Sequence, residues 1–131
     1  MTNILINLSN HPSSKWSESQ KEGWDEIIDI SFPNIPAEYS EMQVLDLVTE
    51  FSAKLGELAN EVEKKNSPLN LCLMGEFSFC YLLKEVLEDN LEGDVWHFFI
   101  PTTERKVVEK QNPDGTTVKT SEFSFVRWRK L

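Results

Sequence analysis

The sequence is poor in the residues that build metal sites and phosphate-binding loops. It has two cysteines, two histidines and five glycines in 131 residues. The cysteines and histidines stand at unrelated spacings and make no zinc motif. The chain contains no G-x-G-x-x-G fingerprint, no P-loop lysine and no G-x-S-x-G elbow. We therefore expect no metal and no cofactor, and the common dinucleotide, Mg-nucleotide and serine-hydrolase chemistries are not indicated.

Long hydrophobic runs are also missing. No apolar stretch approaches the ~20 residues of a membrane span, and the N-terminus lacks the basic and apolar regions of a signal peptide. Cys72 falls in a predicted strand and Cys80 in a predicted helix, which is typical of buried free thiols rather than a disulfide. The sequence therefore predicts a cytoplasmic protein with no membrane association.

A surplus of basic residues is absent, because the net charge is −9. General binding to duplex nucleic acid is not expected of such a chain. The charge is uneven, however: residues 101–131 hold seven cations and four anions, a net of +3, so residues 1–100 carry a net of −12. All three arginines lie in this C-terminal segment, where an anionic ligand would meet them. The alternative is a solubilising charge pattern with a basic tail.

What is present is an alternation of apolar strands and amphipathic helices over one domain, residues 1–131. We expect a long helix capped by Ser40 and ended by residues 64–68, and a β-hairpin turning at residues 112–115. The order predicts an α/β protein: a Rossmann-like βαβαβαβ unit with a mostly parallel sheet, helices on both faces and a C-terminal hairpin. The predicted strands span 3–9, 26–32, 69–74, 95–100, 106–111 and 116–128, and the other helices span 17–24 and 76–90.

Three of the apolar runs pass abruptly into small polar clusters, at residues 9–15, 75–78 and 102–105. If these runs are parallel strands, all three clusters meet at the carboxyl edge of the sheet, where α/β folds place their ligands. The sequence therefore predicts the location of a site.

The first cluster has the richest chemistry. Asparagine, serine and backbone amides suit a phosphate or ribose, and His11 can accept a proton near neutral pH. An ordinary turn around Pro12 is the alternative. The candidate residues are Ser9, Asn10, His11, Ser13, Ser14 and Lys15.

The other two clusters are less specific. Gly75 would let a ligand approach the start of the following helix, while Glu76 is more typical of a helix cap than of a catalytic group. Thr102, Thr103 and Arg105 could contact a phosphate or ribose, or simply belong to a β-strand.

The last predicted strand alternates aromatic residues with arginines. Its pattern places Arg127 and Arg129 in phase with Phe123 and Phe125, with Trp128 on the opposite side. Such a strand could stack on bases or present a packed inner face.

Taken together, four of these motifs resemble small stand-alone CRISPR-associated proteins with a Rossmann-like fold similar to the CARF domain. Some of those proteins are ring nucleases of type III systems. The resemblance implies a homodimer that binds cyclic oligoadenylate. It also implies a metal-independent reaction in which a ribose 2′-hydroxyl attacks its neighbouring phosphate and leaves a 2′,3′-cyclic phosphate. The motifs are residues 8–11 followed by 16–20, then 74–76, 102–105 and 125–129.

Under this hypothesis His11 is the general base or a hydrogen-bond donor, and Lys15 and Arg105 stabilise the phosphate. Asn10 would orient the ribose together with the two threonines. A non-catalytic cyclic-nucleotide sensor or sequestering protein is the alternative, and an α/β protein-interaction module is a further one. The remaining predicted ligand contacts are Ser9, Ser13, Ser14, Gly75, Glu76, Phe77 and Arg127.

Overall fold

The computed structural model describes residues 1–89 and 93–131. It confirms the predicted α/β architecture. Three of the predicted strands match to within a residue, and the long helix begins after its Ser40 cap. The predicted end of the third helix at Asn90 lies outside the described residues. The elements are β1 (Ile4–Ser9), η1 (Ser13–Lys15), α1 (Glu18–Lys21), β2 (Glu26–Ser31), α2 (Glu41–Lys64), β3 (Leu69–Met74), α3 (Phe77–Glu88), β4 (Trp96–Gln111) and β5 (Thr117–Lys130).

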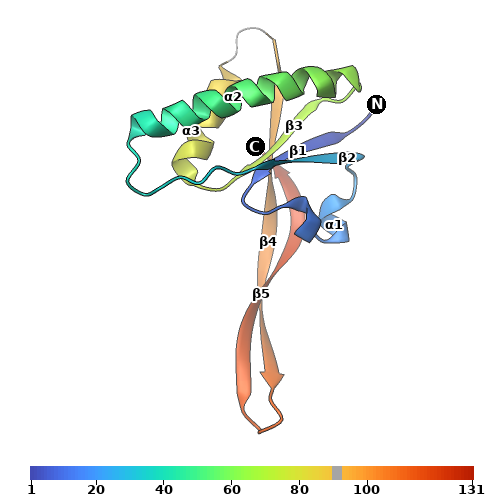
Figure 1. The fold of residues 1–131 in the computed structure, drawn as a ribbon. Coiled ribbons are helices and arrows are strands. Elements are labelled where there is room, and N and C mark those ends of the chain that lie inside the picture. The colour runs from blue at the N-terminus through green and yellow to red at the C-terminus, as the bar shows by residue number, and fades with distance from the viewer. Residues whose placement is uncertain (90–92) are drawn as a thin grey trace.

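The five strands form one sheet in the order β2-β1-β3-β4-β5. The first four are parallel and β5 is antiparallel to β4. The two long helices α2 and α3 cover one face, and the short segments η1 and α1 lie on the other (Figure 1). This distribution follows from right-handed crossovers, because β1 leads sideways to β2 whereas β2 and β3 lead in the opposite direction.

The main core lies between the sheet and the helices α2 and α3. Alternate residues of β1 point into it, and α2 contributes a single stripe that includes Val48, Phe51 and Leu55. Ser40 caps α2 in a reciprocal capping box with Gln43. No helix within residues 1–89 and 93–131 combines the length and apolar character of a membrane span.

A smaller core lies beneath the other face of the sheet. Leu5, Cys72 and Trp16 are buried there, with Trp24 and Trp128 packed against them. The helix expected at 17–24 ends earlier, at Lys21, and a turn at Gly23 with φ +89° carries Trp24 under the sheet. The tryptophan indole of Trp128 donates a hydrogen bond to the carbonyl of Gln20 at 2.9 Å, which ties β5 to α1.

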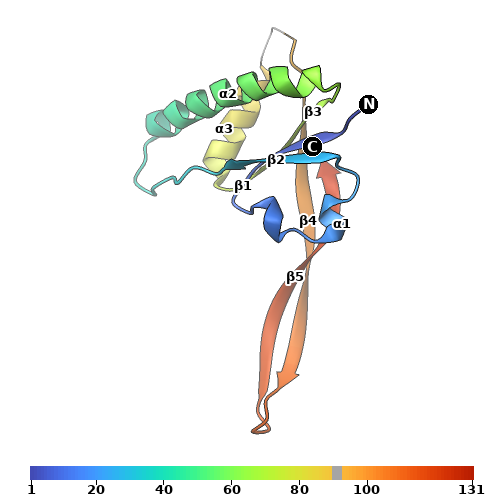
Figure 2. The same cartoon turned by 45° about the vertical axis from the view of Figure 1, so that its right-hand side comes forward.

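The fourth strand does not end at residue 100, as the sequence predicts, but continues to Gln111. Its pairing with β3 stops at Phe99, so at Pro101 the strand β4 pairs with β5 alone. The N–H that proline lacks is therefore not needed for hydrogen bonds to a strand on the other side. Residues 103–125 therefore form a two-stranded ribbon, the arm, that projects away from the rest of the molecule (Figures 1 and 2).

A β-bulge at Val126 overturns the predicted phase of the last strand. Thr102 pairs with Arg127, but Thr103 pairs with Phe125, which leaves Val126 without a partner. The bulge adds one residue, so Trp128 shares a face with Phe125, and their rings lie 5.5 Å apart. Arg127 consequently points to the opposite face of the sheet, not in phase with the phenylalanines.

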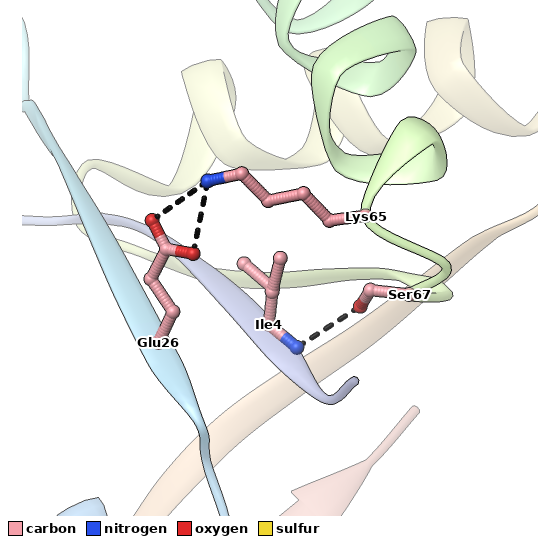
Figure 3. A network of polar contacts seen from close by, with 4 residues as sticks. All are labelled: Ile4, Glu26, Lys65 and Ser67. Carbon is pink, nitrogen blue, oxygen red and sulfur yellow. Dashed lines mark hydrogen bonds and ion pairs between the residues drawn. The ribbon is translucent and has the colours of Figure 1, made fainter. Parts of the chain in front are cut away.

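The amino edge of the sheet is closed by local polar contacts (Figure 3). The Ser67 hydroxyl accepts a hydrogen bond from the Ile4 amide at 2.9 Å, and the Lys65 ammonium lies 3.1 Å from the nearer carboxylate oxygen of Glu26. These contacts join the end of α2 to the first two strands. The polar side chains of the candidate site lie at the opposite, carboxyl edge of the sheet.

Candidate functional site

A cavity of about 500 Å³, the edge cavity, opens at the carboxyl edge of the sheet. Its lining comes from the end of β1 and the segments η1 and α1 on one side, and from the arm on the other. The end of β3 contributes Met74. The lining residues are Ser9, His11, Lys15, Trp16, Gln20, Met74, Pro101, Thr103, Phe123 and Phe125.

The topology explains why the cavity lies here. The chain leaves β1 toward α1 on one face of the sheet and leaves β3 toward α3 on the other. Neighbouring carboxyl ends that diverge in this way leave a crevice between them, which is where doubly wound folds bind ligands. The location predicted from the polar clusters therefore coincides with a cavity in the structure.

A hydrogen-bond network fixes the loop that follows β1. The Asn7 side chain is 1% exposed, and its amide nitrogen donates to the His11 carbonyl at 3.0 Å and to the Asp29 carboxylate at 2.8 Å. The Ser9 hydroxyl lies 2.7 Å from the Asn7 amide oxygen and accepts a bond from the His11 amide at 3.3 Å. Because a buried polar group is costly unless it is bonded, this network holds the loop in one conformation.

Asp29 anchors the far end of this loop. Its carboxylate accepts bonds from the Ser13 hydroxyl at 2.6 Å and from the Ser13 amide at 3.2 Å. Burial opposes ionisation of Asp29, but the hydrogen bonds from Ser13 and Asn7 outweigh it and hold the pKa of this carboxyl below its usual range. Ser9 and Ser13 thus bond to side chains of β1 and β2 within the protein.

The same loop delivers His11 and Lys15 to the cavity. The single turn η1 follows Pro12, with the Lys15 amide bonded to the Pro12 carbonyl at 3.1 Å, and Trp16 is buried directly after it. The rings of Trp16 and Trp128 meet edge to face, 5.4 Å between centroids, which fixes η1 against β5. His11 and Lys15 are exposed and, among residues 1–89 and 93–131, bring the only ionisable side chains to the lining.

The opposite wall of the cavity is aromatic. Phe125 is half-buried and packs against Trp128, while Phe123 is 71% exposed. Both side chains lie on the same face of the sheet as Thr103, which is the cross-strand neighbour of Phe125. The cavity therefore combines a cation and an imidazole on one side with two aromatic rings on the other.

The middle polar cluster lies outside the edge cavity. Gly75 is approached by Phe32, since a Cβ atom on Gly75 would lie 2.3 Å from the end of that ring. Glu76 caps α3: its carboxylate accepts bonds from the Ser78 and Phe79 amides at 3.2 and 2.8 Å. The hydrogen bond from the Ser78 hydroxyl, with that from the Phe79 amide, lowers the pKa of Glu76. Phe77 is 78% exposed beside a separate groove on the α3 face.

The other predicted residues are dispersed around the cavity rather than gathered in it. The Thr102 hydroxyl is bonded to the backbone of Arg127 at the bulge. Arg105 lies on the arm, where its guanidinium donates to the Ser121 hydroxyl. Asn10 lines a second hollow beside β2, and Ser14 is exposed on η1. Of the predicted set, the structure brings Ser9, His11, Lys15 and Thr103 together in one cavity.

Sequence reasoning missed the residues that hold this site in place. Asn7 and Asp29 are cross-strand neighbours, each flanked by apolar residues of its strand. A polar residue at the same register of two adjacent strands is a signal that can be read from the sequence once the pairing is known. Within residues 1–89 and 93–131, no three histidine, cysteine or acidic side chains gather as metal ligands would.

The fold and cavity define an α/β protein with a Rossmann-like sheet and a cavity at its carboxyl edge. The chain belongs to the family described as "Uncharacterized protein MJ1673 family", whose model matches residues 3–129. A search of curated proteins finds no match to the chain. A search of solved structures finds none either.

Proposed function

We propose that this protein binds cyclic oligoadenylate in the edge cavity and opens the ring without a metal, as small CARF-like CRISPR-associated ring nucleases do. One observation carries the proposal: Lys15 and His11 face the aromatic wall of Phe123 and Phe125 across a cavity at the carboxyl edge. A cation opposite aromatic rings suits a phosphate joined to a base. Within the part of the chain that the structure describes, the lining contains no carboxylate that would repel the phosphate.

Ring opening would need a proton acceptor and a cation near the scissile phosphate. His11 is the candidate acceptor for the ribose 2′-hydroxyl proton, and Lys15 is the candidate cation for the phosphate oxygens. Attack of the 2′-oxygen on phosphorus then forms the 2′,3′-cyclic phosphate and releases the 5′-oxygen, which takes up a proton. The fixed loop from Asn7 to Ser13 would supply the positioning that such a reaction requires.

Binding without cleavage is the second candidate, and the position of Arg105 favours it. This arginine is bonded to Ser121 on the arm and is not part of the cavity lining. The edge cavity then offers one cation rather than two to the phosphate. A sensor or sequestering protein requires affinity for the ring but no stabilisation of a transition state.

The proposed assembly is a homodimer, because a ring with twofold symmetry suits two copies of one cavity. Exposed apolar side chains beside the α3 groove provide a surface on which two copies could meet, among them Phe77, Tyr81 and Leu131. Light scattering at micromolar concentration would measure the mass of the particle. A monomer with and without ligand would contradict this part of the proposal.

The decisive experiment incubates the protein with labelled cyclic oligoadenylates of several ring sizes in EDTA. Linear products ending in a 2′,3′-cyclic phosphate would support ring opening, an intact but bound ring would support the second candidate, and absence of binding would overturn both. His11→Ala should abolish cleavage while binding persists. Lys15→Ala should weaken binding at least about tenfold, whereas Lys110→Ala, at the end of β4, serves as the charge-matched control.

A further inference from the structure

The face of the arm that closes the edge cavity continues outward past it. Phe125 and Phe123 lie on this face two residues apart, and Arg105 is the cross-strand neighbour of Phe123. Val107, 63% exposed, follows on the same face. The exposed Phe123 at the cavity wall therefore has an arginine at its side that lies beyond the lining, and the core does not use either of them.

The side chain of Arg105 is held in place by hydrogen bonds. Its Nε and Nη2 atoms lie 3.1 and 2.9 Å from the Ser121 hydroxyl. A guanidinium carries five N–H donors, so most of them remain available to an anion. Fixing the side chain in advance reduces the entropy that binding would otherwise cost.

The charge on this face is suited to phosphate. The carboxylates of the arm lie away from this part of the face. Glu104 and Glu122 lie on the other face, Glu109 lies farther out, and Asp114 lies in the turn. Glu109 is paired with Lys119 at 3.6 Å. Between the cavity and Val107 this face of the arm thus presents Arg105, and Lys15 lies on the other wall of the cavity, with no acid of the lining or of the inner arm beside them.

We propose that Phe123 and Arg105 form a second nucleotide subsite, in which a base stacks on the phenylalanine and the phosphate 5′ or 3′ to it binds the arginine. The inference rests on the proposed function and specifies its ligand class: at least two adjacent, unpaired nucleotides that run from the cavity onto the arm. Residues two apart on a strand are roughly 6.8 Å apart. This is about twice the ~3.4 Å rise of stacked nucleotides, so the two bases must be unstacked from each other.

The test compares ligands that differ by one nucleotide. Wild-type protein should bind the dinucleotide pApA about tenfold or more tightly than AMP, because the second base and phosphate are engaged. Phe123→Ala should remove this gain of pApA over AMP, while Phe123→Trp should retain it. Linear and cyclic tetra-adenylate, measured in parallel, distinguish a requirement for two nucleotides from a requirement for a closed ring.

Arg105→Gln should reduce the salt dependence of pApA binding by about 0.7 in log–log slope and leave that of AMP unchanged. Lys106→Gln removes the same charge from the other face of the arm and should change neither slope. Equal affinity of wild-type protein for AMP and pApA, or a gain that survives Phe123→Ala, would overturn the second subsite but not the proposed function. Failure of every adenylate to bind would overturn the proposed function itself.

Discussion

At the residue scale, the site depends on a few polar groups that face inward. Asn7 is buried in a central strand, yet its amide group connects β1, β2 and the loop that carries His11. Burial of such a residue costs desolvation energy, and this cost is offset only when all its hydrogen bonds are made. The exposed side chains of the cavity are positioned by these buried ones.

Gly75→Ala should lower the free energy of unfolding by about 1–3 kcal/mol, because the new methyl group would overlap the Phe32 ring, which packs edge to face on Phe79. Urea denaturation would measure the change in midpoint. The control is Gly56→Ala, an open position inside α2, which should stabilise the protein by about 0.5–1 kcal/mol. An unchanged midpoint for Gly75→Ala would show that the close approach to Phe32 does not constrain this residue.

Asp29 should make stability depend on pH in the acid range. Its folded pKa lies below the unfolded value, so its contribution is present above about pH 4 and is lost as the pH falls through the folded pKa. Asp29→Asn should therefore destabilise the protein at pH 7 and lose this effect progressively as the pH falls below about 4. Asp46→Asn, on the exposed face of α2, removes the same charge away from this network and serves as the matched control. A destabilisation by Asp29→Asn that does not change with pH would contradict the role of the Asp29 charge.

Both cysteines should be unreactive in the folded protein. They are free thiols, as the sequence predicts, and burial raises the pKa of Cys72 to about 12 and that of Cys80 to about 12. The thiolate is the reactive form, so a disulfide reagent at pH 8 should label neither cysteine quickly until urea unfolds the chain. Fast labelling of the native protein would contradict this.

At the scale of elements, the arm is the part of the molecule with the least support. Its strands pair only with each other, whereas β1 has a partner strand on both sides and is buried along its whole length. A two-stranded ribbon is at best marginally stable alone in water. Its rigidity must therefore come from the part of β4 and β5 that joins the sheet.

Hydrogen exchange should separate the arm from the sheet. Amides of residues 104–111 and 117–124 should exchange at least about 100-fold faster than those of β1 and β3, because opening the ribbon exposes few buried groups. Exchange measured residue by residue by NMR would resolve the two sets. Equal protection would mean that another surface covers the arm.

The elements that could be predicted from sequence are those whose pattern is local. Mainly apolar runs marked β1 and β3, and Ser40 marked the start of α2. The extension of β4 was missed because Pro101 and the polar residues after it are typical of a strand end. The bulge at Val126 was missed because it adds one residue to a regular alternation, which only the pairing with β4 reveals. The same error placed Arg127 on the wrong face. The sequence therefore indicated the edge of the sheet at which the cavity lies, but not the full set of residues that line it.

At the scale of the whole molecule, charge separates the sheet-and-helix body from the C-terminal segment. Residues 1–100 carry a net of −12 and residues 101–131 a net of +3. We expect no binding of duplex DNA or RNA at about 0.15 M salt, because an acidic body repels a rod of phosphates. A gel-shift assay with a duplex, and with a single-stranded oligoadenylate as the matched probe, would test this. A shift with the duplex would contradict it.

The bond from Trp128 to Gln20 joins residues 108 positions apart. Because a ribosome makes a protein from its amino end, the loop with His11 and Lys15 is finished long before the arm and Trp128 emerge. Domains fold as their chain becomes available. The edge cavity takes one wall from residues 9–20 and the other from residues 101–125. It therefore forms only after the arm has emerged, when most of the sheet has already been synthesised.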